Sequence, residues 1–132
     1  MPDATHADLA KYRLEQAHQM VRAASVLHTA GEYKSGNNRA YYAMFHAVRA
    51  LLALEGVDYK KHSAVINHFQ REYVRTGKFN RACSDILMKA STIRNASDYD
   101  DFYLASKEET AEQILNAQKF IAAVDTYLKR LG

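Results

Sequence analysis

Four side chains that can bind phosphate or nucleobases recur at helical spacing in one part of the sequence. They are Arg39, Tyr42, His46 and Arg49, at intervals of three, four and three residues. This spacing aligns them along one stripe of an α-helix. Arginine donates forked hydrogen bonds to phosphate, whereas tyrosine and histidine stack on bases or form hydrogen bonds. The stripe therefore predicts a groove that binds nucleotide or RNA, with a solvated edge that contacts a neighbouring helix or a dimer partner as the alternative.

The helix that carries this stripe has a wide apolar surface. Its apolar sector contains Ala40, Tyr41, Met44, Phe45, Ala47, Val48, Leu51 and Leu52. Because this apolar sector is so wide, we expect the helix to pack against at least two others. Burying the polar stripe beside it costs free energy unless those groups are paired or face a cleft.

Helical periodicity covers most of the remaining chain. The expected helices span residues 5–30, Lys34 or Asn37 to Glu55, 63–76, 80–97 and 106–131. The third and fourth are expected to turn Ile66, Phe69, Tyr73, Ile86, Ala90 and Ile93 inward. No stretch alternates apolar and polar residues for long enough to form a strand.

Glycines and one capping motif mark where these helices should end and begin. Gly31, Gly36, Gly56 and Gly77 are expected at boundaries, where a left-handed residue commonly ends a helix. Ser106 and Glu109 have the spacing of a capping box, in which each side chain binds a free amide of the first turn. Since the connections are short, neighbouring helices should be antiparallel. The sequence thus predicts an all-α fold, an up-and-down bundle of four to five helices, with residues 1–132 forming one domain.

Composition limits the class of protein. Of 132 residues, 48% are hydrophobic and 25% are charged, which is enough apolar material for one globular core. A single cysteine, Cys83, excludes a disulfide framework. No secretory leader and no apolar run of membrane-spanning length is found, so we expect a cytoplasmic protein without membrane contact. The six histidines lack the spacing of metal ligands and no glycine-rich phosphate loop occurs, so we expect no metal and no cofactor.

Charge is unevenly distributed although the net charge is only +3. Between residues 60 and 81 the basic residues are Lys60, Lys61, Arg71, Arg75, Lys78 and Arg81, against Glu72 alone. Between residues 98 and 112 the acidic residues are Asp98, Asp100, Asp101, Glu108, Glu109 and Glu112, against Lys107 alone. Such a split indicates a phosphate-binding face or a docking surface, or simply two solvated helix faces.

The segment Arg39–His46, with the sequence Arg-Ala-Tyr-Tyr-Ala-Met-Phe-His, resembles the signature of the HEPN superfamily in its small stand-alone prokaryotic branch. Gly31-Glu32-Tyr33 before it, His62 after it, and Arg94-x-x-x-Asp98-Tyr99 agree in order. The resemblance implies a helical bundle, usually a homodimer, that acts with nucleotides or RNA. It also implies pairing with a minimal nucleotidyltransferase, commonly as the toxin of a toxin–antitoxin system.

Many proteins of this superfamily are metal-independent RNases whose motif is an arginine followed a few residues later by a histidine. Arg94 matches the arginine, but Tyr99 stands where the histidine is expected, and no histidine occurs after His68. RNA cleavage through the 2′-hydroxyl needs a general base with a pKa near neutrality, and the ordinary pKa of tyrosine is about 10. His46 or His62 could replace the missing base if it folds close to Arg94.

The resemblance and the stripe together define two sets of candidate residues. The candidate catalytic residues are Arg94, Asp98, Tyr99 and His46. The candidate nucleotide- or RNA-binding residues are Arg39, Tyr42, His46, Arg49, Arg94 and Asn95. As the alternative, Arg94 and Asp98 lie four residues apart and could form only a surface ion pair.

Three functions stay open from the sequence. The first is a module that binds nucleotide or RNA and pairs with a nucleotidyltransferase. The second is an RNase toxin that uses a displaced histidine, and the third is a non-catalytic dimerisation or adaptor bundle. Tyr99 and Tyr103 are candidate acceptors of a nucleotidyl group from the partner enzyme.

Overall fold

The computed structural model describes residues 4–131. Its elements are α1 (Ala4–Thr29), α2 (Tyr33–Glu55), α3 (His62–Phe69), the π-helical segment η1 (Gln70–Val74), α4 (Arg81–Tyr99) and α5 (Lys107–Leu131). No strand occurs among the described residues, so the predicted all-α fold is confirmed. Within the same range, no helix combines the length and the apolar character needed to cross a membrane.

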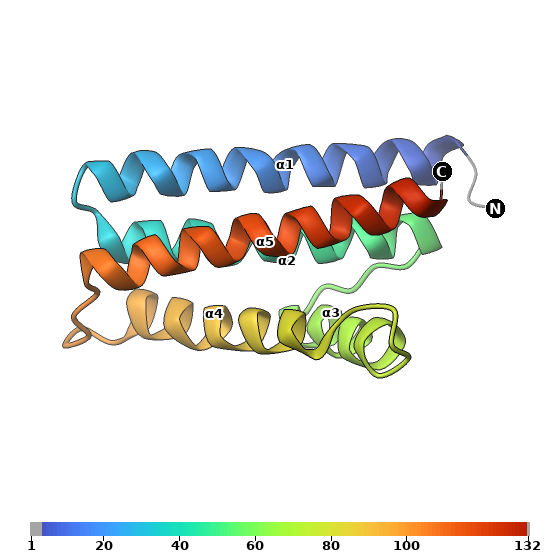
Figure 1. The fold of residues 1–132 in the computed structure, drawn as a ribbon. Coiled ribbons are helices and arrows are strands. Elements are labelled where there is room, and N and C mark those ends of the chain that lie inside the picture. The colour runs from blue at the N-terminus through green and yellow to red at the C-terminus, as the bar shows by residue number, and fades with distance from the viewer. Residues whose placement is uncertain (1–3, 132) are drawn as a thin grey trace.

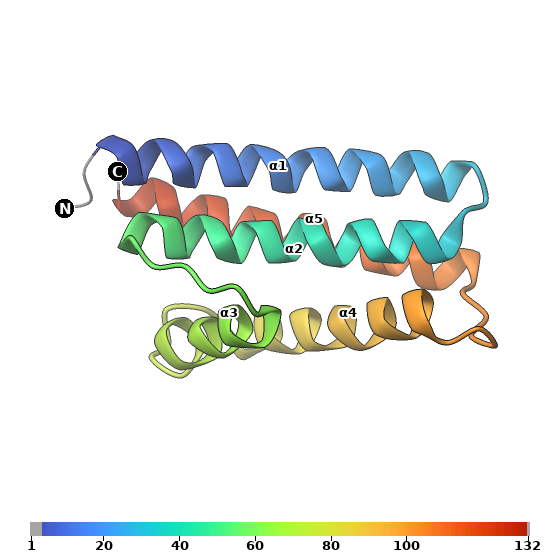
Figure 2. The ribbon, with the colours of Figure 1, turned by 180° about the vertical axis from the view of Figure 1, so that it is seen from behind.

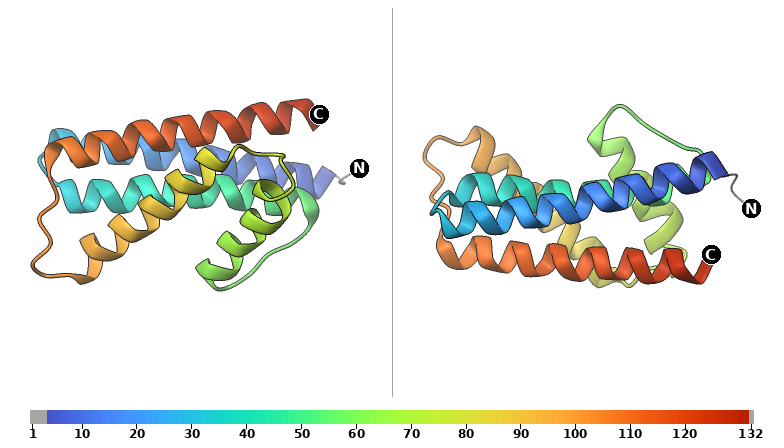
Figure 3. Two further views of the ribbon diagram at one scale, coloured as in Figure 1. Left: turned by 60° about the horizontal axis from the view of Figure 1, so that its bottom comes forward. Right: turned by 90° about the horizontal axis from the view of Figure 1, so that it is seen from above.

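The long helices alternate in direction and form three layers. Figures 1 and 2 show α1 on one side, α2 and α5 in the middle, and α3 and α4 on the other side. Along the chain, α2 returns antiparallel to α1 and α5 returns antiparallel to α4, while α4 crosses the middle layer obliquely (Figure 3). The predicted up-and-down bundle is therefore confirmed, with α3 and η1 as a short crossing element.

Helix α2 is the centre of the bundle. It contacts α1, α3, α4 and α5, which confirms the expectation of at least two neighbours. Met44, Leu51 and Leu52 are fully buried in it. Buried alanines on both helices, such as Ala17 on α1 and Ala47 on α2, leave room for close packing between them. The side chains of α2 are consequently packed against all of these neighbouring helices.

The glycine predictions are confirmed at three positions and wrong at one. Gly31, Gly56 and Gly77 have φ angles of 81°, 74° and 81° at the ends of helical segments. Gly36 instead lies inside α2, which begins at Tyr33 rather than at Lys34 or Asn37. A Cβ atom at position 36 would lie 2.7 Å from Thr110 Cγ2 on α5. This glycine therefore permits close approach of α5 and does not end a helix.

The contact at Gly36 gives a stability prediction. Gly36→Ala should lower the free energy of unfolding by about 1–2 kcal/mol, because overpacking outweighs the gain of about 1 kcal/mol in helix propensity. Thr110→Ser removes Cγ2 and keeps the hydroxyl that donates to the Tyr33 carbonyl oxygen at 3.1 Å. In that background the alanine should be neutral or stabilising. Urea denaturation of the four proteins of this double-mutant cycle measures the coupling, and equal penalties in both backgrounds would contradict the explanation.

The predicted third helix has the expected extent but changes type midway. After Phe69 the chain forms a π-turn, in which the Arg75 amide donates to the Gln70 carbonyl oxygen at 2.8 Å. Ile66, Phe69 and Tyr73 are buried as predicted. The wider turn lets the ring of Tyr73 stack on Phe69, with centroids 6.0 Å apart, while both face the core.

The inward face of α4 is confirmed, and the capping box of α5 needs correction. Ala90 and Ile93 are buried and Ile86 is partly buried against the core, as expected, while Leu87 is fully buried in addition. Of the expected capping box, only one half forms: Ser106 Oγ accepts from the Glu109 amide at 3.0 Å. The Glu109 carboxylate instead accepts hydrogen bonds from Asn37 Nδ2 at 3.1 Å and from the Tyr103 hydroxyl. It therefore ties α5 to α2 and to the preceding loop.

Candidate functional site

Arg94 on α4 reaches back to the polar stripe of α2. Its Nη2 donates to the Tyr42 hydroxyl at 2.9 Å, and its Nε lies 2.9 Å from Asp98 Oδ2. Only 16% of the Arg94 side chain is exposed, compared with 22% for Asp98. The ion pair considered for these two residues is present, but it is partly buried and joined to the stripe rather than isolated on the surface.

Aromatic rings surround the Arg94 guanidinium. Its central carbon lies 5.5 Å from the Tyr41 ring centroid, 5.3 Å from that of Tyr42 and 5.6 Å from that of Tyr99. These distances are within the range of cation–π attraction. The rings hold the cation in place while leaving its charge available to an anion in the cleft.

His62, the first residue of α3, lies in the same cleft as Arg94. The cleft has a volume of about 270 Å³ and is also lined by Tyr41 and Asn95. The His62 ring centroid is 4.2 Å from that of Phe45, and its Nδ1 forms a hydrogen bond of 3.2 Å with the Tyr41 hydroxyl. Burial lowers the pKa of His62, and the nearby positive charges of Arg94 and Arg49 lower it further. The imidazole is therefore neutral at pH 7.

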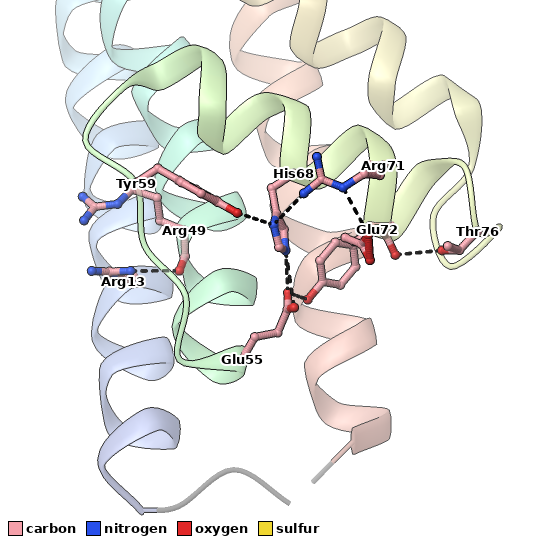
Figure 4. Close-up of polar contacts among 9 residues, drawn as sticks. Arg13, Arg49, Glu55, Tyr59, His68, Arg71, Glu72 and Thr76 are labelled. Carbon is pink, nitrogen blue, oxygen red and sulfur yellow. Dashed lines mark hydrogen bonds and ion pairs between the residues drawn. The ribbon is translucent and has the colours of Figure 1, made fainter.

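The loop before α3 is fixed by one carboxylate. Asp58 accepts a hydrogen bond from the Tyr59 amide at 2.9 Å and lies 3.3 Å from Arg49 Nη2 and 3.4 Å from Arg13 Nη2. Arg13 Nη1 also donates to the Arg49 carbonyl oxygen at 3.2 Å (Figure 4). Burial opposes ionisation of Asp58, but the amide and the two guanidiniums outweigh it and lower its pKa. The loop is thus tied to both α1 and α2.

The other end of α3 is fixed by a buried histidine. His68 Nε2 lies 3.1 Å from Glu55 Oε2, and its Nδ1 forms a hydrogen bond of 3.0 Å with the Tyr59 hydroxyl. Figure 4 shows these contacts. The Tyr73 hydroxyl donates to the same Glu55 carboxylate. Burial and Glu55 raise the pKa of Tyr73. Because both ends of α3 are held, its first residue, His62, has a defined position against α2.

The predicted stripe lies on one face of α2, but its members belong to different surroundings. Tyr42 and His46 are in ring contact, with centroids 6.2 Å apart. Arg39 donates to Asn38 Oδ1 at 2.7 Å and lines a separate cleft with Asp98. Arg49, at the other end, pairs with the loop before α3. The stripe is therefore a row of contacts along α2, of which Tyr42 is the one joined directly to Arg94.

The two histidines proposed as a replacement base are placed differently. His62, and not His46, lines the cleft that contains Arg94. Burial lowers the pKa of His46, followed by the charges of Arg49 and Arg13 and by His62. His46 Nδ1 is buried and has no hydrogen-bond partner among residues 4–131. Of the two, His62 has the position that a base acting beside Arg94 requires.

The two candidate acceptor tyrosines also differ. The side chain of Tyr99 is 74% exposed and lies beside the Arg94 guanidinium. The hydroxyl of Tyr103 donates to Glu109 Oε2, and burial together with that carboxylate raises its pKa to about 12. Asn95, the remaining candidate, accepts a hydrogen bond from Arg94 Nη1 at 3.2 Å.

Sequence reasoning missed one polar member of the site. It assigned Tyr41 to the apolar sector of α2, and the ring is indeed buried. Its hydroxyl, however, reaches His62, and burial raises the pKa of this phenol to about 12. A buried tyrosine beside a polar stripe usually needs a hydrogen-bond partner, and this was the available signal.

The lowered pKa values of the two histidines predict loss of stability in mild acid. The unfolded chain binds protons on His46 and His62 near the ordinary pKa of about 6.5, whereas the folded chain resists protonation. This contribution to stability is present above pH 6.5 and declines as the pH falls through the folded-state values. Urea denaturation between pH 7.5 and 5 should show a shallower decline for the variant with both His46→Gln and His62→Gln. An unchanged pH profile would contradict the prediction.

Comparisons with known proteins agree with the fold and extend over most of the chain. A family model for the HEPN domain matches residues 10–127. A protein of Thermotoga maritima named UPF0332 protein is 31% identical over 121 residues, which cover 92% of each chain. A protein of Methanocaldococcus jannaschii named "Putative toxin" is 32% identical over 119 residues, covering 89% of this chain and 87% of its own.

One solved structure has the same architecture. The crystal structure of the Thermus thermophilus protein TT1696 superposes with a TM-score of 0.76 at 21% identity. The match covers 89% of this chain and 97% of that one. At this identity the similarity supports the arrangement of the helices alone.

Proposed function

The chain belongs to the HEPN domain family, and we propose that it binds single-stranded RNA in the cleft between α3 and α4. The observation that carries this proposal is that Arg94 and His62 line one open cleft, while the exposed ring of Tyr99 lies beside Arg94. A guanidinium is suited to bind a phosphate. Unpaired bases can stack on exposed aromatic faces, and they are the usual target of RNA recognition.

The surroundings of Arg94 favour a ligand with one negative charge at this point. The Asp98 carboxylate lies beside Arg94 Nε and neutralises part of the guanidinium charge. The Tyr42 hydroxyl accepts the hydrogen bond from Nη2. Asn95, which accepts from Nη1, is exposed. A phosphate oxygen can replace this contact without breaking the ones that position the arginine. A phosphodiester, with a single negative charge, matches this arrangement.

Fluorescence anisotropy with a labelled single-stranded RNA of mixed sequence tests the proposal. Binding should be saturable and should weaken as salt rises, because phosphate contacts release counterions. An RNA duplex of the same sequence should bind more weakly, since its bases are not accessible for stacking. Absence of saturable binding at low salt would sink the proposal and favour the non-catalytic adaptor.

Cleavage of the bound RNA is a second candidate function, favoured by the position and neutral state of His62. In the tautomer whose Nδ1–H donates to Tyr41, the Nε2 lone pair is free to take the proton of a ribose 2′-hydroxyl. The 2′-oxygen then attacks the adjacent phosphorus, and Arg94 stabilises the charge that builds up on the phosphate. The bond to the 5′-oxygen breaks, and that oxygen takes a proton from solvent. The products are a 2′,3′-cyclic phosphate and a free 5′-hydroxyl.

Mass spectrometry of RNA incubated with the protein and EDTA distinguishes cleavage from binding alone. The cyclic phosphate should form with the wild type and not with His62→Gln, whereas His18→Gln, an exposed histidine on α1, should not change the rate. If the wild type binds RNA but leaves it intact, the protein is a binding module. If His46→Gln abolishes cleavage and His62→Gln does not, His46 is the base.

The biological setting that we propose follows the family and the name of one relative. The chain would act in the cytoplasm as the toxin of a toxin–antitoxin pair, as a homodimer, with a minimal nucleotidyltransferase as its partner. A nucleotidyltransferase encoded beside this chain, and a complex of the two proteins on co-expression, are the expected observations. Sedimentation of the purified chain at twice its mass of 15.0 kDa tests the homodimer.

Tyr99 is the proposed acceptor of a nucleotidyl group, in preference to Tyr103. Tyr99 is exposed beside Arg94, whereas the hydroxyl of Tyr103 is held by Glu109. A nucleotide attached to Tyr99 would place its phosphate next to Arg94 and block the cleft. After co-expression with the nucleotidyltransferase, the intact mass should increase by one or more nucleotides. Tyr99→Phe should prevent the increase and Tyr103→Phe should not; the reverse pattern would contradict the assignment.

A further inference from the structure

A second cleft meets the first at His62. It has a volume of about 530 Å³ and is lined by Phe45, Arg49, Asp58, Tyr59, Lys60 and His62. His62 also lines the cleft that contains Arg94. The imidazole therefore stands between two openings on the same side of α2, and a ligand that passes His62 can occupy both.

The second cleft carries excess positive charge. Arg49 and Arg13 share the single carboxylate of Asp58, at 3.3 Å and 3.4 Å, so one guanidinium charge is not balanced. Arg49 Nε is buried and has no hydrogen-bond partner within residues 4–131. Lys60 lines the opening and is exposed. These groups provide cationic donors that the fold itself does not use up.

The spacing of the cationic groups identifies the class of ligand. Arg94 is hydrogen-bonded to Tyr42 on α2, and Arg49 comes seven residues after Tyr42 on the same helix. Tyr42 and Arg49 are therefore about 10 Å apart along the helix axis. The adjacent phosphates of a nucleoside diphosphate are too close together to reach both points. Successive phosphodiesters of a strand, separated by a ribose, can do so, with His62 between them.

We propose that the site takes a strand with at least two successive phosphodiesters, one held by Arg94 and the next by Arg49 and Lys60. Tyr59 and Phe45 line this second cleft, and the intervening nucleoside lies against them. This inference rests on the proposed binding of single-stranded RNA and adds a minimum length and a second phosphate subsite. Mononucleotides and dinucleotides fill only part of such a groove.

Uridine, UpU and UpUpU, which carry none, one and two phosphodiesters, are suitable probes for calorimetric titration. UpUpU should bind about tenfold more tightly than UpU. The salt dependence, plotted as log K against log salt concentration, should also be steeper for UpUpU by up to roughly 0.7, the value for one additional phosphate contact in single strands. Uridine should bind most weakly of the three.

Lys60→Gln separates the second subsite from the rest of the protein. This lysine makes no hydrogen bond or ion pair in the described part of the chain, so its replacement should not affect folding. The ratio of UpUpU affinity to UpU affinity should fall toward one in this variant and in Arg49→Gln. Lys119→Gln, the same change of charge at an exposed position on α5, should retain the tenfold ratio.

The outcomes distinguish this inference from the function on which it rests. If neither UpU, UpUpU nor a longer strand binds, the proposed RNA-binding function fails. If UpU and UpUpU bind equally with equal salt dependence, RNA binding stands and the second subsite is overturned. An unchanged ratio in Lys60→Gln together with Arg49→Gln also overturns it.

Discussion

Replacing Arg94 with glutamine should weaken the binding of single-stranded RNA by about a hundredfold. The loss of a partly buried charged partner costs about 3 kcal/mol, and 1.4 kcal/mol corresponds to a factor of ten. Glutamine keeps a polar side chain of moderate length but removes the charge, the contact with Tyr42 and the ion pair with Asp98. Fluorescence anisotropy at fixed salt measures the change.

Two further variants make the Arg94 experiment specific. Arg22→Gln makes the same change of charge at an exposed position on α1 and should leave the affinity within about twofold, as screening predicts for a distant surface charge. Arg94→Lys keeps the charge but cannot contact Tyr42 and Asp98 at once, so its affinity should be intermediate. Equal losses for Arg94→Gln and Arg22→Gln would mean that RNA senses only the net charge of the protein.

Loss of binding must also be separated from loss of folding. Arg94 joins α4 to α2, and removing it leaves Asp98 without its cationic partner, although Asn38 Nδ2 still donates to Asp98 Oδ2 at 2.9 Å. We expect a decrease of about 1–2 kcal/mol in the free energy of unfolding, within the range for a broken charged contact. A folded population then still predominates, so affinity can be measured on native protein. Urea denaturation of each variant provides the correction.

The helical framework could be predicted because its signals are local. Apolar periodicity, three of the four internal glycines and the resemblance at Arg39–His46 depend on residues close in sequence. Gly36 was misread because a glycine inside a helix and a glycine at its end look the same without knowledge of Thr110 on α5. Glu109 was assigned to a capping box for the same reason, since its partner Asn37 comes from another helix.

The candidate site could be predicted only in part because it is assembled from three helices. The stripe on α2 and Arg94 on α4 were each visible, but their contact through Tyr42 depends on how α4 crosses α2. His62 was one of two possible replacements for the missing histidine, and periodicity could not choose between them. His62 is placed beside Arg94 by the loop before α3 and by the contacts that hold α3. These contacts join residues that are far apart in sequence.

Among substitutions of the side chains that hold α3 in the bundle, Phe69→Ala has the largest expected effect on stability. Phe69 is fully buried at the end of α3. Its ring centroid lies 5.4 Å from that of Phe79 and 5.5 Å from that of Phe120 on α5. Truncation of a buried phenylalanine to alanine costs about 3–5 kcal/mol, from lost burial and from the cavity that remains. This is a large part of the 5–15 kcal/mol typical of a folded domain.

Phe102→Ala is the matched control, because the same atoms are removed from a side chain that is 93% exposed. Its free energy of unfolding should change by less than about 0.5 kcal/mol. The difference between the two variants in urea denaturation therefore isolates the contribution of burial at position 69. Similar changes in the free energy of unfolding for the two variants would mean that the contacts of Phe69 with Phe79 and Phe120 do not hold α3 in place.

The Phe69 variant also tests whether the position of His62 depends on the packing of α3. His62 is held at the other end of this short helix, and its ring lies against Phe45 on α2. If α3 loosens while the rest of the bundle stays folded, hydrogen exchange should accelerate in α3 before it does in α1 and α2. RNA affinity, corrected for the folded fraction, should then fall in Phe69→Ala and not in Phe102→Ala. Uniform acceleration across all helices would instead show that α3 unfolds only with the whole bundle, so that His62 is as fixed as the core itself.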